Sequence, residues 1–584
     1  MVSMIKTNRL KKIACRVLLP ALCLGLCSCS PASAPAESEN SAVQTVDDAT
    51  IQDSVTVYAD DDETSVVTMY LTVSQGNEAD NTNHTWQDVN NYSVYYYEEK
   101  GIERYAVEGI LQVGDENGPV SGAFGYGEFS PNCTVQIRGK TSTRSPQKSY
   151  KISIRNNEGY WREQRTINLN KHVYDSVRFR NKLSYDLLKT VPGAFSVRTQ
   201  FVRLYVKDLT GGNAGASFED YGLYTQVEQI NKTYLRNHGL DENGQLYKAN
   251  MFEFLRYEEA IKETTDPTYD LSTFERVLEV KGNDDHSKLI AMLDDLNNYS
   301  VPIETTFPKY FDEENYFTWM AFQLLTGNTD TINQNFFLYS PQNGNKWYFI
   351  SWDNDGAWRY EDDIVYREEG SGYNYTQGIT RYWGSVLHQR VLKSETYRRK
   401  LDDKINELRQ LITREKVAAM VAQYSAVTRP FLTRLPDQMH APRTIGEYDS
   451  ILTMIPKEMD YQYELYKTSL TRPMPFYLGM PEPAGGRLMY GWDSSYDLTG
   501  EKVHYTFELA RDYTFKNILS TQTDLMVPQA FTDVLDPGQY FYRVTAVNES
   551  GKTQTAMETY QNDDGQKYYG VFCFYIGADG TIYG

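Results

Sequence analysis

The sequence has few of the residues from which disulfide frameworks and zinc sites are built. It contains 6 cysteines and 7 histidines in 584 residues. Three cysteines lie within the first 27 residues and a fourth is Cys29, so only Cys133 and Cys573 remain, far apart in the chain. No HExxH motif is present. A disulfide-stabilised fold, a cysteine-based zinc site and a zinc hydrolase are therefore all disfavoured.

The chain also lacks an excess of basic residues. It has 58 Lys and Arg against 78 Asp and Glu, which gives a net charge of −20. Because a protein that binds a phosphate backbone needs a basic surface, this charge argues against nucleic acid as the main partner. It favours basic partners or divalent cations. The hydrophobic share of 40% is enough for buried cores, so a wholly disordered chain is excluded.

The first 29 residues carry the features of an export signal. A basic stretch ending at Arg16 precedes an apolar run, residues 17–26, that is short for a membrane span. The run ends in the sequence LCSC, which resembles a bacterial lipobox and implies cleavage before Cys29 and lipidation of its thiol. Residues 30–53 are expected to form a flexible tether. We therefore expect export and a lipid anchor on the outer face of the cytoplasmic membrane, and an ordinary signal peptide is the alternative.

The rest of the chain divides into three blocks. Residues 54–126 contain β-type runs punctuated by Gly and Asn, which predict a small β region. Residues 127–474 mix strands and helices and then become mainly helical, an order that predicts a two-lobed α+β domain. Residues 475–584 alternate apolar and polar side chains, which predicts an all-β sandwich. Trp492 and the run 537–547 resemble a fibronectin type III module, for which a spacer or stabilising role is the simplest interpretation.

Residues 327–356 carry the side chains most typical of chemistry. Asp330 is followed five residues later by Asn335, and two β-type runs then lead to Asp353. The turn-forming residues between the two runs predict a β-hairpin, which returns the chain to the place where it began. Asp330, Asn335 and Asp353 are therefore expected to converge at one end of the hairpin. Asp355 is an alternative to Asp353.

Two carboxylates and an amide at this spacing are the parts that phosphoryl transfer needs. One Asp orients the incoming hydroxyl and accepts its proton, while the Asn and the second Asp supply oxygen ligands to a Mg²⁺ that bridges phosphates. Protein kinases have the same spacing between the Asp and the Asn. The His-Arg pair that precedes the catalytic Asp of those kinases is replaced here by Asn328 and Thr329. By itself the pattern is also typical of a structural or calcium-type Asp turn.

Four ordered motifs resemble the CotH (spore-coat protein H) kinase-like family. They are residues 137–151 (IRGKTSTRSPQKSYK), 179–187 (FRNKLSYDL), 221–230 (YGLYTQVEQI) and 330–355, where Ser351 replaces the usual Pro. The resemblance covers roughly residues 122–474. It implies an atypical protein-kinase fold that transfers the γ-phosphate of ATP to Ser or Thr of secreted or surface proteins, with Mg or Mn as the metal.

The resemblance also implies roles for the three converging residues and for one lysine. Asp330 is the expected catalytic base, and Asn335 and Asp353 are the expected metal ligands. Lys148 is the candidate for neutralising the phosphates of ATP, because a compact point charge suits that position. Lys151 is a second candidate for this role. Alternatively, Lys148 is a solvent-exposed lysine of a strand without a functional role.

The resemblance also implies roles for Arg138 and Glu228, and each of them has two possible roles. Arg138 contacts phosphate or forms a salt bridge within its own lobe. Glu228 lies at a hinge near the adenine or pairs with a basic residue of its own lobe. Neither choice is decided by the sequence.

Two classes of function remain open. The first is a metal-dependent protein kinase that acts outside the membrane on a secreted or surface protein. The acidic run 361–363 favours a basic substrate, although a solvated loop is the commoner origin of such a run. The second is a non-catalytic cell-surface adhesin or scaffold with the same fold. The joint presence of Asp330, Asn335 and Asp353 favours the kinase, whereas the scarcity of ATP outside the cell favours the adhesin.

Overall fold

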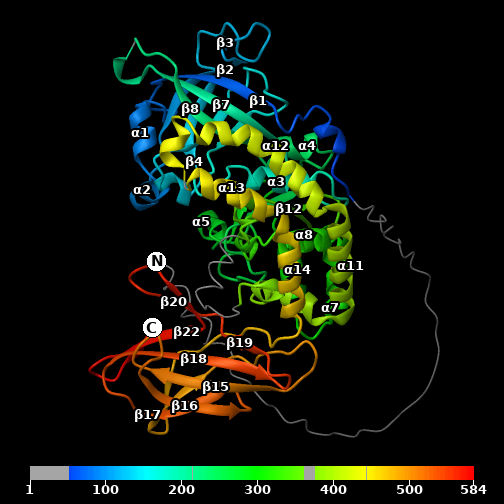
Figure 1. Cartoon of the computed structure of the whole chain (residues 1–584), viewed down its shortest axis with the longest axis vertical. Helices are drawn as coiled ribbons and strands as arrows, with labels where there is room; N and C mark the ends of the chain where they lie inside the picture. Colours follow the sequence, from blue (N-terminus) through cyan, green and yellow to red (C-terminus); the bar gives the residue numbers. More distant parts are fainter. Residues whose placement is uncertain (1–50, 214, 361–374, 442) are drawn as a thin grey trace, which may run out of the picture.

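The computed structural model describes residues 51–360 except 214, and residues 375–584 except 442. A β-rich lobe lies at one end, a helical lobe in the middle and an all-β unit at the other end (Figure 1). The predicted α+β class with two lobes and a C-terminal all-β region is confirmed. Cys29 and the acidic run 361–363 lie outside the described residues. Within the described ranges, no helix is both long and apolar enough to cross a membrane.

An eight-stranded sheet forms the N-terminal lobe. Its strand order is β1-β7-β8-β6-β5-β4-β2-β3, and the additional pairing of β1 with β2 closes seven of the strands into a barrel. Alternate side chains fill its interior, among them Val135, Ile137 and Ile152. The strands are β1 (Val66–Ser74), β2 (Ala106–Asp115), β3 (Gly118–Pro119), β4 (Cys133–Arg138), β5 (Ser149–Ile154), β6 (Thr166–Asn170), β7 (Thr199–Asp208) and β8 (Glu219–Glu228).

The expected small β region at residues 54–126 is not a separate unit. Strand β1 runs parallel to β7, and β2 runs antiparallel to β4, so the strands of this region are integral to the barrel. Two short helices, α1 (Trp86–Asn91) and α2 (Val94–Lys100), lie between β1 and β2. A boundary at residue 126 would therefore cut through one hydrogen-bonded sheet.

The helical lobe is built around a four-stranded sheet and the buried helix α8. The sheet has the order β10-β9-β11-β12. Every residue of α8 from Asn315 to Leu325 is buried, because other elements cover all of its sides. The strands are β9 (Gln245–Ala249), β10 (Leu278–Val280), β11 (Phe336–Ser340) and β12 (Tyr348–Ser351). The helices are α6 (Ser287–Leu296), α7 (Ile303–Tyr310), α8 (Glu313–Leu325), α10 (Val386–Lys393), α11 (Glu395–Leu411), α12 (Arg414–Leu432), α13 (Ile445–Met454) and α14 (Glu458–Ser469).

Two larger sheets and a two-stranded sheet, β20 (Thr559–Gln561) with β21 (Lys567–Tyr569), belong to the C-terminal unit. One of the larger sheets has the order β13-β14-β17 and the other β16-β15-β18-β22-β23, with β19 beside β18. Trp492, Phe507 and Tyr542 pack between them. The Tyr540 hydroxyl donates to the Asp536 carbonyl at 2.8 Å. This resembles the tyrosine corner of immunoglobulin-like sandwiches and favours the fibronectin type III interpretation, which stays a prediction. The strands are β13 (Glu482–Ala484), β14 (Arg487–Gly491), β15 (Val503–Ala510), β16 (Ile518–Leu525), β17 (Gln529–Asp533), β18 (Gly538–Asn548), β19 (Thr553–Thr555), β22 (Val571–Ile576) and β23 (Ile582–Tyr583).

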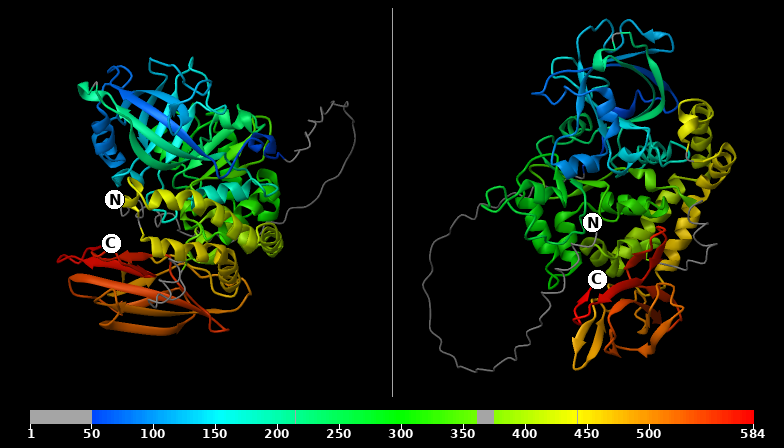
Figure 2. Two further views of the ribbon diagram at one scale, coloured as in Figure 1. Left: turned by 45° about the horizontal axis from the view of Figure 1, so that its top comes forward. Right: turned by 90° about the vertical axis from the view of Figure 1, so that its left-hand side faces the viewer.

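The C-terminal unit packs directly against the helical lobe (Figure 2). Trp383, just before α10, stacks on Tyr496 with 5.8 Å between the ring centroids. The Lys393 ammonium lies over both rings, at 5.4 and 5.3 Å from their centroids. These contacts fix the unit to the lobe rather than leaving it on a free linker.

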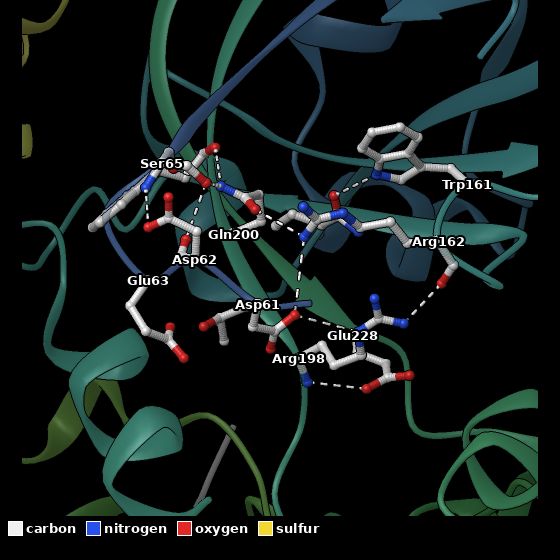
Figure 3. Close-up of polar contacts among 12 residues, drawn as sticks. Asp61, Asp62, Glu63, Ser65, Trp161, Arg162, Arg198, Gln200 and Glu228 are labelled. Carbon is white, nitrogen blue, oxygen red and sulfur yellow. Dashed lines mark hydrogen bonds and ion pairs between the residues drawn. The ribbon is translucent and has the colours of Figure 1, made fainter. Parts of the chain in front are cut away.

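An acidic segment at the start of the described chain lies against Arg162 and Arg198 of the N-terminal lobe (Figure 3). Asp61 accepts from the Lys189 ammonium at 2.9 Å, and Glu63 accepts from Lys182 at 2.7 Å. Asp53 contacts Nδ1 of the buried His238 at 2.6 Å, while Nε2 of the same ring lies 3.0 Å from Glu228. Burial opposes the charge on the ring, but hydrogen bonds to the two carboxylates raise the pKa of His238 to about 9.

We expect the stability of the protein to fall as pH rises from about 6.5 to about 9. The pKa of His238 is higher in the folded state than its ordinary value of 6.5, so protonation stabilises the fold below that range and the gain disappears above it. The rise in the pKa of His238 corresponds to a loss of about 3 kcal/mol in the free energy of unfolding over this pH range. Urea unfolding at pH 6.5 and pH 9 measures it. The control His440→Gln should lose as much stability between the two pH values as the unmodified protein. An equal loss in His238→Gln would show that His238 is not its cause.

Candidate active site

Strands β11 and β12 form the predicted hairpin. Phe336 pairs with Ser351 and Tyr339 pairs with Tyr348. All residues of both strands are buried, so the hairpin is held in the core. Asn335 directly precedes β11, and Asp353 follows β12 by two residues. Both therefore lie at the open end of the hairpin, as the sequence predicts.

Asn335 is bound directly to Asp330. Its Nδ2 donates to Asp330 Oδ2 at 2.9 Å, and Gln334 Nε2 donates to Asp330 Oδ1 at 3.1 Å. Asn335 has a φ of 59°, in the left-handed region that Asn tolerates better than most residues. The Asn335 amide thus orients the Asp330 carboxylate. In the described part of the chain, Asn335 Oδ1 accepts no hydrogen bond.

The turn that carries Asp353 is fixed by α3 (Arg180–Leu188), a helix buried along its whole length. The Tyr185 hydroxyl accepts from the Asp353 amide at 2.9 Å, and Asn181 Oδ1 accepts from the Asn354 amide at 3.0 Å. These bonds hold Asp353 at a φ of 52°. Strain of this kind persists only where the surroundings impose it, and it is concentrated at functional sites.

Gly356 brings this turn against Asp330. A Cβ at position 356 would lie 3.0 Å from Asn328 Oδ1 and 3.2 Å from Asp330 Cβ. Asn328 also donates from Nδ2 to Asn354 Oδ1 at 3.2 Å. The short helices η5 (Thr329–Thr331) and η6 (Asn354–Gly356) therefore touch, and a side chain at position 356 would require Asn328 or Asp330 to shift by a few tenths of an ångström.

The pKa values of the Asp353 and Asp355 carboxyl groups are both raised. The pKa of Asp353 is raised by burial and by Asp330, against the opposing effects of Arg138 and Lys248. The pKa of Asp355 is raised well above its ordinary value, first by burial and then by Asp353. The described surroundings therefore do not fully neutralise the negative charge gathered here. A divalent cation would relieve this repulsion.

The oxygen atoms present fit a cation of the Mg²⁺ type that binds together with phosphates. In residues 51–360 and 375–584, apart from the omitted positions, no three His, Cys, Asp or Glu side chains form a complete metal-binding group. A phosphate-bridging site does not need one, because the protein supplies one or two carboxylates and the phosphates supply further ligands. Asn335 Oδ1 and the Asp353 carboxylate accept no hydrogen bond from any described residue, so both are available as ligands.

Comparison with known proteins identifies the family. The sequence pattern of the family described as CotH kinase protein matches residues 135–465, more than half of the chain. The chain belongs to the CotH kinase family. Among solved structures, the proinflammatory kinase CtkA of Helicobacter pylori is similar, with 11% identity, a TM-score of 0.26, and coverage of 55% of this chain and 95% of CtkA. No curated protein sequence matches the chain.

Within the CotH domain, the two candidate lysines have different surroundings. Lys148 is buried, and its Nζ donates to the Thr143 carbonyl at 2.7 Å, so it supports the turn between β4 and β5. Arg138 pairs with Ser149, and Lys151 lies two residues further along the same strand. Because side chains alternate along a strand, Arg138 and Lys151 project from the same face. Lys151 therefore shares a face with Arg138, whereas the Lys148 ammonium is bound to the Thr143 carbonyl.

Arg138 forms no ion pair within its own lobe among the described residues. Its charge opposes the rise in the pKa of Asp353. In the described part of the chain it has no hydrogen bond or salt bridge. An Arg with five unused donors beside a metal-binding candidate is suited to contact phosphate.

Glu228 has the second of its two predicted roles. Its Oε2 accepts from the Arg198 backbone amide at 3.0 Å and contacts His238 Nε2 at 3.0 Å (Figure 3). It therefore pairs with a basic residue of its own lobe. The contacts tie the end of β8 to the segment that carries Asp53.

The sequence alone does not indicate the roles of several residues that shape the CotH site. Asn181 and Tyr185 belong to the motif 179–187 but give no sign that they hold the Asp353 turn. Asn328 stands where the sequence pattern of protein kinases has His, and its Nδ2 donates to Asn354 Oδ1. The motif 179–187 is the only sequence signal that could have indicated these roles, because it marks the buried helix α3.

Proposed function

We propose that the protein is an extracytoplasmic protein kinase that transfers the γ-phosphate of ATP to Ser or Thr of a secreted or surface protein and requires Mg²⁺ or Mn²⁺. The observation that carries this proposal is the convergence of Asp330, Asn335 and Asp353 at one end of the buried hairpin. Membership of the CotH kinase family supports it.

The contacts at the site support a role for each residue. Asp330, oriented by the Asn335 amide, accepts the proton of the acceptor hydroxyl. Asn335 Oδ1 and Asp353 would hold the metal, which would supply positive charge to the phosphates. Arg138 and Lys151, on one face of the barrel, would contact the phosphates from the opposite side.

The location outside the cytoplasmic membrane rests on the first 29 residues. The basic stretch, the short apolar run and the sequence LCSC ending at Cys29 support export and lipid anchoring. We propose that the anchored enzyme acts on proteins at the cell surface, and the net charge of −20 favours basic ones.

Nucleotide binding tests the proposal. ATP with Mg²⁺ should stabilise the purified protein against thermal unfolding, by about 2.7 kcal/mol at a concentration of 100 times Kd. Transfer of label from γ-labelled ATP to protein should accompany it. If ATP does not stabilise the protein with any divalent metal, the kinase proposal is wrong and the adhesin or scaffold alternative gains.

A further inference from the structure

The segment that precedes β1, residues 51–65, forms a strap that is attached to both lobes. At its first residue, the Ile51 amide donates to the Tyr348 hydroxyl of β12, in the helical lobe, at 3.4 Å. At its last residue, the Ser65 hydroxyl accepts from the Gln200 side chain of β7, in the barrel, at 3.0 Å (Figure 3). The N-terminal strap is therefore fixed at both ends, and the residues between them contact α3.

Two carboxylates of the N-terminal strap pair with two lysines of α3 and its C-terminal end. Asp61 lies 2.9 Å from the Lys189 ammonium. Glu63 lies 2.7 Å from the Lys182 ammonium and 3.0 Å from that of Lys189. The Lys182 side chain is fully buried, and that of Lys189 is 6% exposed. Asp186 lies 2.8 Å from both ammonium groups, but one carboxylate cannot neutralise two buried cations. The charge balance at α3 therefore depends on the strap.

The neighbouring face of α3 holds the turn that carries Asp353. On this face the Tyr185 hydroxyl accepts from the Asp353 amide, and the Asn181 side chain accepts from the Asn354 amide. Because a helix has 3.6 residues per turn, positions 181 and 185 lie on one face and the charged positions 182, 186 and 189 lie on the next. Helix α3 therefore links the N-terminal strap to the turn.

Apolar packing alone does not fix the position of α3. All nine of its residues, Arg180–Leu188, are buried, and several of them are charged or polar. The buried Asp186 carboxylate accepts from the Thr199 hydroxyl of β7 at 2.8 Å and from the Tyr424 hydroxyl of α12 at 2.6 Å. A buried charge is stable only where its partners hold it. The strap, β7 and α12 therefore set the position of α3 together.

We infer that the N-terminal strap positions the active site: through Asp61 and Glu63 it holds α3, and through α3 it holds the turn that carries Asp353. This inference rests on the proposed function, because Asp353 is the expected metal ligand there. Asp61 and Glu63 are positioning residues, since their partners are the lysines of α3. Loss of their charges loosens the turn without removing any expected ligand of the metal.

Hydrogen exchange at the amides of Asp353 and Asn354 tests the inference, because side chains of α3 are their partners. Mass spectrometry measures it on the full chain without metal or nucleotide. The double variant Asp61→Asn with Glu63→Gln keeps the size of both side chains and removes both charges. It should speed exchange at these two amides about tenfold, while the amides of β18 in the C-terminal unit exchange as before.

Two further variants control for the loss of charge. Asp62 is exposed, and its carboxylate accepts from the amides of Thr64 and Ser65 within the strap. Asp62→Asn should therefore leave the exchange at residues 353–354 unchanged. Adding Lys189→Met to the double variant leaves Lys182 paired with Asp186 and should restore most of the protection.

Three results would overturn the inference. The first is unchanged exchange at residues 353–354 in the double variant. The second is an equal increase in β18 or in Asp62→Asn, which would show a general loss of stability. The third is no restored protection on adding Lys189→Met. The two proposals can fail separately. Faster local exchange in a protein that transfers no phosphate removes only the kinase, whereas unchanged exchange in a protein that transfers phosphate removes only the inference.

Discussion

Asp353→Asn is expected to lower phosphate transfer by about 10²–10³-fold or more, because it removes the charged ligand of the metal. The same substitution should make the metal-free protein more stable near neutral pH. The pKa of Asp353 is raised in the folded state, so its ionised form destabilises the fold, and stability falls as pH rises through that pKa. Asn has nearly the same shape without the charge. Thermal unfolding without metal and transfer of labelled phosphate measure the two effects.

The response to metal provides the control for this substitution. Mg²⁺ with ATP should stabilise the unmodified protein more than Asp353→Asn. Asp355→Asn, two residues further along the same turn, should also raise the metal-free stability but should lose less activity. If Asp355→Asn is inactive and Asp353→Asn keeps its activity, the metal ligand is Asp355.

Asp330→Asn is expected to lower the turnover number by about 10²–10⁴-fold and to leave nucleotide binding nearly unchanged. Asp330 is held by Asn335 and Gln334, and it faces the place where the acceptor hydroxyl is expected. The amide keeps the size of the side chain but cannot accept the proton. Steady-state transfer assays and ATP calorimetry separate the two effects.

Gln334→Ala serves as the matched comparison for Asp330. It removes one hydrogen bond to the same carboxylate and leaves the proton acceptor in place. We expect a loss of about tenfold or less. Equal losses in Gln334→Ala and Asp330→Asn would mean that Asp330 has a structural role and is not the base.

The hairpin and its convergent residues could be predicted because their signals are local. Turn residues lie between two short apolar runs, so the pairing of Phe336 with Ser351 follows from the sequence of that segment. The return of the chain then brings Asp353 to Asn335. The family motifs add the likeness to kinases, which the spacing of Asp330 and Asn335 alone leaves open.

Side-chain direction and long-range pairing could not be predicted in the same way. Lys148 and Lys151 are three residues apart, and a shift of one position in a strand moves a side chain to the other face. The bond of Lys148 to the Thr143 carbonyl could not be foreseen for this reason, and the choice between the two lysines stays a prediction. The contacts of Asp61 and Glu63 with α3 join segments that are far apart in the chain. The same holds for β1 and β2, whose partners in the barrel do not follow from local patterns.

The most direct test is a crystal structure of the protein with Mn²⁺ and a non-hydrolysable ATP analogue, in which anomalous scattering locates the metal. We expect a Mn²⁺ peak at about 2.0–2.3 Å from Asn335 Oδ1 and from an oxygen of Asp353, with the phosphates as further ligands. Asp330 should lie beside the terminal phosphate. A metal bound elsewhere, or a nucleotide bound without contact to Asn335 and Asp353, would contradict the account.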